Sequence, residues 1–333
     1  VRGLGGGKGR VPLRKNDITV AEVLKMAGYT TGITGKWGLG EPSTLGIPNR
    51  QGFDEWFGYL NQRRAHSFFP TFIWLNEGRF DLPGNSNGKK QQYTHDLFTG
   101  FALSFIRKNK DKPFFLYLPY TVPHSRFEIP DLGPYDKKEW PEKAKVYAAM
   151  ITRMDAHIGY IMKLLKELKI DEKTIVFFCS DNGAANRYEG LFDSSGPLRG
   201  RKRDMYEGGL RTPMIVRWPN RVPSNQTNEA LWSFTDFLPT AADMANIKPP
   251  EKLDGMSVLP TLLGQKQATN KRFLYWEFFE GGFQQAVRWD KWKFIRREKD
   301  ELLELYNLDD DIGEENNLAA TQSGIVAKFQ EYL

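Results

Sequence analysis

The segment TIVFFCSDNG, residues 174–183, is an apolar run that ends abruptly in Ser180, Asp181, Asn182 and Gly183. The run is typical of a buried strand in a parallel sheet. Its end has two interpretations. One is an ordinary turn, because Asp, Asn and Gly satisfy local backbone groups and tolerate positive φ. The other is a hard-cation site, because ligands of open α/β sheets bind at the carboxyl ends of the strands, where carboxylate and amide oxygens suit Ca²⁺ or Mg²⁺.

The segments around this strand alternate between helical and strand patterns. We expect helices at 17–27 (with an N-cap at Asp17), 96–108, 142–169 and 234–245, and strands at 29–34, 113–120, 174–179 and 214–218. This alternation predicts an α/β fold with a mostly parallel central sheet flanked by helices. Residues 41–92 are rich in Gly, Pro, Asn and aromatic residues, and we expect a long irregular excursion there.

Near the C-terminus the sequence pattern changes from alternating helices and strands to short strand-like segments. Short aromatic segments separated by turn residues predict antiparallel strands at 273–278, 285–289, 292–295 and 303–306, followed by a helix near 323–333. We therefore expect an α/β domain over residues 1–268 and a small C-terminal α+β subdomain, with an antiparallel sheet and a helix, over residues 269–333.

The composition narrows the class of protein. Of the 333 residues, 40% are hydrophobic and 14% aromatic, which supports a packed core and argues against disorder. Mean hydropathy is −0.54, and no apolar run reaches the roughly 18 residues of a membrane span. The net charge of +6 favours an anionic partner. The single cysteine, Cys179, excludes an internal disulfide, and we expect it to be packed and inert.

Polar residues follow three of the predicted strands, as Lys36, His124 and Asp181 with Asn182, and the basic segment 199–203 comes after a further loop. Because the carboxyl ends of parallel strands lie at one edge of a sheet, we expect these residues to meet. Each has a plainer interpretation, as a loop lysine, a core histidine, a turn and a solvated basic loop. Together they predict a site for a tetrahedral oxyanion, in which cations stabilise developing charge and a histidine protonates the leaving group.

Several motifs resemble, in order, those of type I (formylglycine-dependent, arylsulfatase-like) sulfatases of the alkaline-phosphatase-like superfamily. They are AGYTTGITGKWGLG (27–40), GFDEWFGY (52–59), PFFLYLPYTVPH (113–124), YAAMITRMDAHIG (147–159), VFFCSDNG (176–183), GPLRGRKRDMYEGGLRTPMIVRWP (196–219), DFLPTAADMANI (236–247) and ELYNLDDDIGEENNLA (304–319). The resemblance covers essentially the whole chain.

The resemblance implies a role for each site residue. Asp181 and Asn182 are implied as two ligands of a Ca²⁺ ion, with Mg²⁺ as an alternative. Lys36 and Lys202 are implied to contact sulfate oxygens and to stabilise the charge of the leaving group. His124 is implied as a general acid or as a sulfate-binding group near the leaving oxygen.

This sequence departs from the family pattern in two respects. Gly38 stands where the family often has a histidine that supports the nucleophile. His66 is a candidate substitute or a substrate contact, and its alternative is an ordinary loop histidine. The family's nucleophile is a formylglycine made from a Cys/Ser-x-Pro-x-Arg motif, and an Asp-Asp pair completes its metal site. We expect both upstream of Val1 and neither within this chain, so that the chain is N-terminally truncated and inactive by itself.

The function that the resemblance implies is removal of sulfate from a sulfated carbohydrate, with aryl sulfates as surrogates. The aromatic-rich segment 41–92, with Arg63, Arg64 and Arg126, is predicted to line an anionic carbohydrate cleft, in which Arg63 and His66 bind substrate. Sulfatases of this type are commonly exported, so the resemblance implies a periplasmic or secreted protein.

Other functions remain as alternatives. A phosphatase or phosphodiesterase of the same superfamily needs a two-metal shell, which is hard to assemble from the four histidines, 66, 95, 124 and 157. A non-catalytic remnant that binds sulfated glycans is the other alternative. Nucleic-acid binding is not expected, because Asp204 and Glu207 interrupt the basic segment and no reading module is recognisable.

Overall fold

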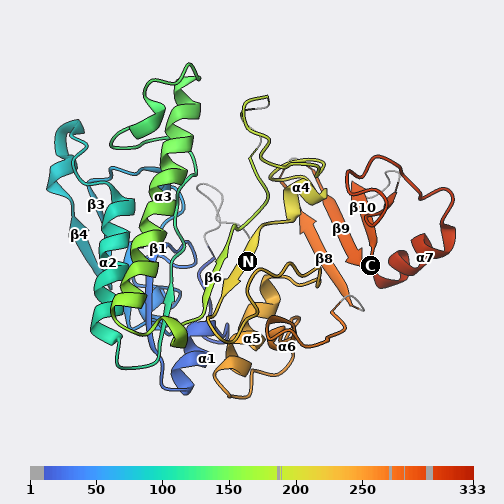
Figure 1. Cartoon of the computed structure of the whole chain (residues 1–333), viewed down its shortest axis with the longest axis horizontal. Helices are drawn as coiled ribbons and strands as arrows, with labels where there is room; N and C mark the ends of the chain where they lie inside the picture. The colour runs from blue at the N-terminus through green and yellow to red at the C-terminus, as the bar shows by residue number, and fades with distance from the viewer. Residues whose placement is uncertain (1–10, 186–187, 189, 270–271, 281, 298–302) are drawn as a thin grey trace. The chain divides into compact units, whose positions relative to one another are not determined.

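The computed structural model describes residues 11–185, 188, 190–269, 272–280, 282–297 and 303–333 (Figure 1). The chain divides into two compact units. The first comprises Val1–Thr174 and Phe237–Ser257, and the second comprises Ile175–Asp236 and Val258–Leu333. No helix in the described ranges is both long and apolar enough to cross a membrane.

The first unit is built on a five-stranded sheet with the strand order β4-β3-β2-β1-β5. Its strands are β1 (Thr30–Lys36), β2 (Glu55–Tyr59), β3 (Phe72–Leu75), β4 (Gly78–Asp81) and β5 (Phe114–Tyr117). Its helices are α1 (Val20–Met26), α2 (Thr94–Asn109), α3 (Glu142–Glu167) and α5 (Phe237–Met244), with 3-10 turns at Pro48–Arg50, Arg64–His66, Pro83–Gly88, Gly133–Tyr135 and Asp171–Lys173.

The centre of this sheet is parallel. Strand β1 pairs in parallel with β2, Gly32 opposite Glu55, and with β5, Thr30 opposite Phe114. Helices α2 and α3 run side by side on one face (Figure 1). Strand alternation turns Gly32 toward Phe105 of α2 and Ile33 toward the cluster that contains Ala21 of α1. The predicted α/β fold with a mostly parallel central sheet is confirmed.

Two local predictions in the first unit are wrong. The N-cap of α1 is Thr19, whose hydroxyl accepts from the backbone of Glu22 while the Glu22 carboxylate accepts from the backbone of Thr19. This capping box satisfies two helix-end donors, which Asp17 does not. The segment 41–92 is also not irregular throughout, because it contains β2, β3 and β4. Its short strands are separated by glycine and proline, which hid their alternation.

The second unit contains two separate sheets. Its elements are β6 (Val176–Cys179), α4 (Glu207–Leu210), β7 (Met214–Arg217), a 3-10 turn at Phe234–Asp236, α6 (Leu259–Leu262), β8 (Phe273–Phe278), β9 (Gln284–Trp289), β10 (Trp292–Arg297), β11 (Glu304–Asn307) and α7 (Ser323–Tyr332). Strand β6 pairs antiparallel with β7, Phe177 opposite Val216. Among the described strands β6 pairs with β7 and not with the five-stranded sheet, so the expectation that residues 174–179 form a strand of the parallel central sheet is wrong.

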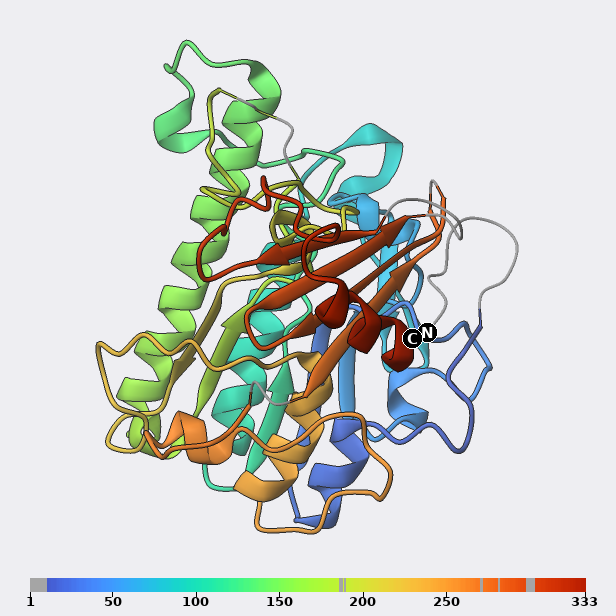
Figure 2. The ribbon, with the colours of Figure 1, turned by 90° about the vertical axis from the view of Figure 1, so that its right-hand side faces the viewer.

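The four C-terminal strands form an antiparallel sheet in the order β11-β10-β9-β8, as predicted. Both faces of this sheet are covered. On one face Val287, Phe294 and Leu305 pack with Phe329 of α7 (Figure 2). The other face packs against the segment that leads into α4, through a cluster that contains Tyr206. A sheet buried on both faces does not show the simple polar–apolar alternation of an exposed one.

The close packing of β1 generates a first prediction. Gly35 has φ +136°, and a Cβ there would lie 2.3 Å from the carbonyl oxygen of Pro119. Gly35→Ala combines backbone strain with a steric clash, so we expect it to lower the free energy of unfolding by about 2–4 kcal/mol. Urea unfolding monitored by circular dichroism measures the change.

Gly100 is the matched control, because it lies within α2 and a Cβ there would meet nothing within 4 Å. Gly100→Ala should raise the free energy of unfolding by about 0.5–1 kcal/mol, through helix propensity. Equal unfolding midpoints for the two variants would show that β1 does not need a glycine at position 35.

Candidate active site

Lys36 is the last residue of β1 and is held between the two neighbouring strands. Its backbone N–H donates to the carbonyl of Pro119, beyond β5, at 2.9 Å, and the next N–H, of Trp37, donates to the carbonyl of Tyr59 at the end of β2 (2.9 Å). The following Gly38 has φ +84°. A side chain there would be strained and its Cβ would lie 3.1 Å from Oε1 of Gln62, which gives a local reason for glycine at this position.

Two of the predicted site residues, His66 and His124, lie in contact. Their rings stack with centroids 4.3 Å apart and planes 15° apart. Nδ1 of His124 lies 2.6 Å from the carbonyl oxygen of Ser125. Because a carbonyl only accepts, this nitrogen carries the hydrogen, and Nε2 is the ring atom that can take up or deliver a proton. The spacing in sequence did not predict this stacking.

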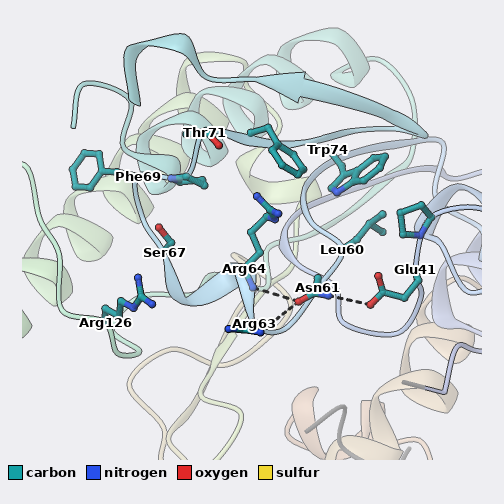
Figure 3. A pocket seen from close by; sticks show the side chains of 13 residues that line it. Glu41, Leu60, Asn61, Arg63, Arg64, Ser67, Phe69, Thr71, Trp74 and Arg126 are labelled. Carbon is teal, nitrogen blue, oxygen red and sulfur yellow. Dashed lines mark hydrogen bonds between the residues drawn. The ribbon is translucent and has the colours of Figure 1, made fainter. Parts of the chain in front are cut away.

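Three arginines lie near His66 in sequence or by contact. The backbone N–H of Arg126 donates to the carbonyl of His66 at 3.2 Å. Arg63 and Arg64 lie three and two residues before His66, and their backbone N–H groups donate to Oδ1 of Asn61 at 2.8 and 3.4 Å. All three arginines line a pocket in the first unit (Figure 3). The predicted substrate-binding residues Arg63 and His66 lie on the same 3-10 turn, of which Arg63 is the N-cap and His66 the last residue.

In the second unit, Asp181 and Asn182 follow β6 after one intervening residue, Ser180. Nδ2 of Asn182 donates to Oδ1 of Asp181 at 2.8 Å, which leaves the amide oxygen and the second carboxylate oxygen as donors for a hard cation. The next residue, Gly183, donates its N–H to the carbonyl of Gly209 at 2.9 Å. The strand end is thus tied to the start of α4.

Lys202 lies on the loop that returns to this strand end. Its backbone N–H donates to the carbonyl of Ala184 at 2.8 Å, and the loop is closed by Gly208, whose N–H donates to the carbonyl of Arg199 (2.8 Å). The second unit therefore places the backbone of Lys202 beside the segment that carries Asp181 and Asn182. Lys36 and His124 belong to the first unit, where Lys36 ends β1 and His124 follows β5.

A buried ionic cluster supports this loop from the C-terminal sheet. Lys293 of β10 is fully buried, and its ammonium lies 2.7 Å from Oε1 of Glu207 and 3.7 Å from Oε1 of Glu314. Glu314 Oε2 accepts from the backbone N–H of Glu207 at 2.7 Å. Arg199 donates to the backbone carbonyl of Glu314 and to the hydroxyl of Tyr306. Both ends of the Lys202 loop are thus anchored.

The two glutamates of this cluster have opposite pKa shifts. Burial raises the pKa of Glu314 from 4.5 to about 7, against the opposing effect of the Lys293 charge. Burial acts in the same sense on Glu207, but the charge and hydrogen bond of Lys293, with Arg288, outweigh it and lower its pKa. Lys293 is therefore paired chiefly with Glu207. Sequence analysis missed this cluster, whose signal was a lysine between apolar residues, in Trp292-Lys293-Phe294-Ile295.

Asp181 and Asn182 provide the oxygen ligands that a hard cation prefers, but they are too few to complete its coordination. Ca²⁺ takes about six to eight oxygen ligands, of which Asp181 and Asn182 supply two. No group of three or more His, Cys, Asp or Glu side chains able to hold a metal ion occurs within the described ranges.

Two predictions about reactive side chains need correction. Cys179 is exposed rather than packed, because it ends β6. Burial of part of the side chain and the charge of Asp181 nevertheless raise the pKa of its thiol, which disfavours the reactive thiolate. The expectation that no Cys/Ser-x-Pro-x-Arg motif lies within the chain is also wrong, because Ser195-Gly196-Pro197-Leu198-Arg199 has that spacing.

The surroundings of this motif do not suit a nucleophile. The hydroxyl of Ser195 donates to the carbonyl of Gly200 at 3.3 Å, and Arg199 is committed to Glu314 and Tyr306. The motif lies in a turn rather than at the start of a helix.

Comparison with known proteins gives one consistent result. The family model described as Sulfatase matches residues 4–247, and that of the N-sulphoglucosamine sulphohydrolase C-terminal region matches residues 200–333. The chain is 34% identical to N-acetylgalactosamine-6-sulfatase of Canis lupus familiaris, over 77% of this chain and 50% of the relative. It is 32% identical to an arylsulfatase of Hemicentrotus pulcherrimus, over 79% of this chain and 49% of the relative. The chain spans about half the length of these two relatives.

Among solved structures, the chain is similar to Ps i-CgsB in complex with k-i-k-neocarrahexaose. The TM-score is 0.79 and the identity 26%, over 98% of this chain and 78% of that one.

The pKa of Glu314 generates a prediction about stability. The folded pKa, about 7, lies above the ordinary value of 4.5, so the folded state binds this proton more tightly. The stabilisation is complete below the unfolded pKa and is lost as the pH rises through the folded one. We expect the melting temperature to fall between about pH 5 and pH 8, and Glu314→Gln to reduce this fall.

Glu315→Gln is the control, because Glu315 is the exposed neighbour on the same turn. Thermal melts of the three proteins across this pH range measure the effect. An unchanged pH dependence in Glu314→Gln would show that Glu314 does not titrate in this range.

The surroundings of Ser195 predict that it stays a serine. Mass spectrometry of the peptide that contains Ser195, from protein made in a host able to form formylglycine, should give the mass of unmodified serine. Loss of two hydrogens, with reactivity toward hydrazides, would identify an aldehyde at Ser195 and overturn this expectation.

Proposed function

This chain belongs to the sulfatase family, and we propose that it acts in the hydrolysis of sulfate monoesters of a sulfated carbohydrate, with aryl sulfates as surrogate substrates. The observation that carries the proposal is the match of the Sulfatase family model to residues 4–247. Within this region Lys36, His124, Asp181, Asn182 and Lys202 stand in the segments that resemble the family's motifs. A phosphatase is not favoured, since the matching family model and the similar curated proteins are those of sulfatases.

In the proposed reaction, the ammonium groups of Lys36 and Lys202 contact sulfate oxygens and stabilise the charge that develops as the S–O bond breaks. His124 in its doubly protonated form delivers the proton of Nε2 to the leaving oxygen and becomes neutral, while Nδ1 keeps its hydrogen and its bond to the carbonyl of Ser125. Asp181 and Asn182 would hold a Ca²⁺ or Mg²⁺ ion, which supplies further positive charge at the sulfate. The family generally implies such a metal and a formylglycine, whose hydrated aldehyde supplies the nucleophilic oxygen.

His66 and Arg63 are proposed to bind substrate. The stacking of His66 on His124 supports this assignment, because a substrate group that reaches His124 also meets His66. Arg63 is exposed and lines the adjoining pocket. The carbohydrate class is supported by Ps i-CgsB, whose structure holds k-i-k-neocarrahexaose, and by the net charge of +6, which favours an anionic substrate.

Two further assignments are proposals. A periplasmic or secreted location is supported by the resemblance to exported sulfatases. A subdomain over residues 269–333 is supported by the antiparallel sheet β8–β11 and by α7, which together form a buried cluster around Phe294 and Phe329.

The proposed role of His124 predicts a dependence on the leaving group. A sugar alkoxide needs a proton as it leaves, whereas a nitrophenolate does not. His124→Gln in the protein made from its native gene should lower kcat/KM for a sulfated sugar by about 10²–10⁴-fold, and for nitrophenyl sulfate far less. Equal losses for both substrates would assign His124 to sulfate binding instead.

Lys36→Gln should lower kcat/KM for both substrates by about 10²–10³-fold, because it removes charge stabilisation of the transition state. Lys25→Gln is the matched control, since Lys25 is a partly exposed lysine that pairs with Asp54 on the surface. Sulfate release measured by ion chromatography compares the variants. Absence of sulfate release from the unaltered protein with either substrate class would favour a non-catalytic glycan-binding role.

A further inference from the structure

The first unit contains a pocket of about 730 Å³ (Figure 3), and two of its lining residues, Arg64 and Ser67, lie within two residues of His66 in the sequence. This volume lies within the range of about 300–1,000 Å³ that is typical of small-molecule sites. Its wall is partly aromatic, from Phe72 and Trp74, and partly cationic, from Arg63, Arg64 and Arg126.

The aromatic wall follows from the alternation of β3. Ile73 is fully buried on the core side of the sheet, so Phe72 and Trp74, one residue either side of it, face the pocket. Both rings are half-buried, with centroids 6.4 Å apart. Rigid aromatic faces of this kind provide apolar contact area for the C–H face of a sugar ring at little cost in conformational entropy.

Arg64 is held in place without an anionic partner. Its guanidinium lies over the Phe72 ring at 3.7 Å, and Arg79 covers the same ring at 4.0 Å. Arg79 pairs with Asp81, whereas no carboxylate within the described ranges forms a salt bridge with Arg64. Partial burial and the charge of Arg79 lower the pKa of Arg64. A positioned, partly desolvated guanidinium is well suited to bind a sulfate or carboxylate through two hydrogen bonds.

The other charged residues that line the pocket also favour an anionic ligand. Arg63 and Arg126 are exposed, and neither forms a salt bridge with a carboxylate of the described residues. Glu41, the acidic residue of the wall, accepts a hydrogen bond from Nδ2 of Asn61 at 3.1 Å. Three arginines thus face a pocket with a single carboxylate.

We propose that this pocket binds a second sugar ring of the substrate, next to the ring that loses its sulfate, and that this second ring carries its own anionic group. The inference rests on the proposed function. Its geometric basis is a chain of contacts from the pocket to the histidines. The N–H of Arg126, a pocket residue, donates to the carbonyl of His66, and His66 stacks on His124. Arg64 binds the anionic group, and Trp74 with Phe72 contacts the ring.

Calorimetric titration of the chain with three disaccharides tests the proposal. Each carries a non-hydrolysable sulfonate on the first ring; the second ring is neutral, sulfated or a uronate. We expect the two doubly anionic probes to bind roughly tenfold more tightly than the singly anionic one, or better. The ratio between them identifies sulfate or carboxylate as the preferred group. Equal affinity for all three probes would overturn the proposal.

Variants locate the preference. Arg64→Gln should abolish it, whereas Arg79→Gln should leave it intact, because Arg79 covers the same ring but is paired with Asp81. Trp74→Ala should weaken all three probes to a similar degree. Thermal melts check that each variant is folded. A preference that persists in Arg64→Gln would contradict the assignment of the anionic group to this arginine.

Lys36→Gln separates the two proposals. If the proposed function is correct, Lys36→Gln weakens all three probes, because each carries the group that mimics the reacting sulfate. If Arg64→Gln abolishes the preference while Lys36→Gln changes nothing, the pocket is an anionic-sugar site and the proposed role of Lys36 is wrong.

Discussion

The geometry of the second unit depends on one buried ammonium group, that of Lys293. A lysine without any exposure is tolerated only when it is paired and hydrogen-bonded, and Glu207 and Glu314 fulfil that requirement. Such a cluster adds little net stability compared with well-packed apolar side chains, but removal of one partner leaves a costly unpaired charge. The pairing therefore selects one position of α4, whose first residue is Glu207, against the sheet. Because the Lys202 loop ends at α4, the position of α4 also determines the position of this loop.

The fold class could be predicted from the sequence because its determinants are local. The long apolar stripe of α3 and the aromatic C-terminal strands are visible within short windows. The strands of the 41–92 segment were not, because each of β3 and β4 has four residues, too few for alternation to stand out from the turns between them. The partner of β6 was also hidden, since β7 lies beyond a long loop and nothing in either strand encodes the direction of pairing.

In the candidate site, too, the features with a local sequence signal could be predicted and the long-range contacts could not. Residues at strand ends, such as Lys36 and Asp181, were identified because a turn residue after an apolar run is a local signal. The stacking of His66 on His124 was not, because 57 residues and two unrelated loops separate them. At Ser195 the sequence does contain the nucleophile motif that was expected only upstream of this chain. The motif lies in a turn and its Arg199 is already hydrogen-bonded to Tyr306, so these surroundings do not suit a nucleophile. A sequence motif gives residue types at a fixed spacing, whereas the fold decides which of their atoms are already hydrogen-bonded and which can react.

The hairpin of β3 and β4 lies at the outer edge of its sheet, and every residue of β4 is exposed. It bears Phe72, Trp74 and Arg79, while Lys36 lies two strands inward on β1. An edge hairpin can change in length or sequence without disturbing the ladder that holds the inner strands. Under the proposed function, recognition of the outer part of a glycan and cleavage of its sulfate ester could therefore diversify separately. The hairpin is accordingly a natural segment to exchange between relatives when a new glycan preference is to be engineered onto an unaltered reaction centre.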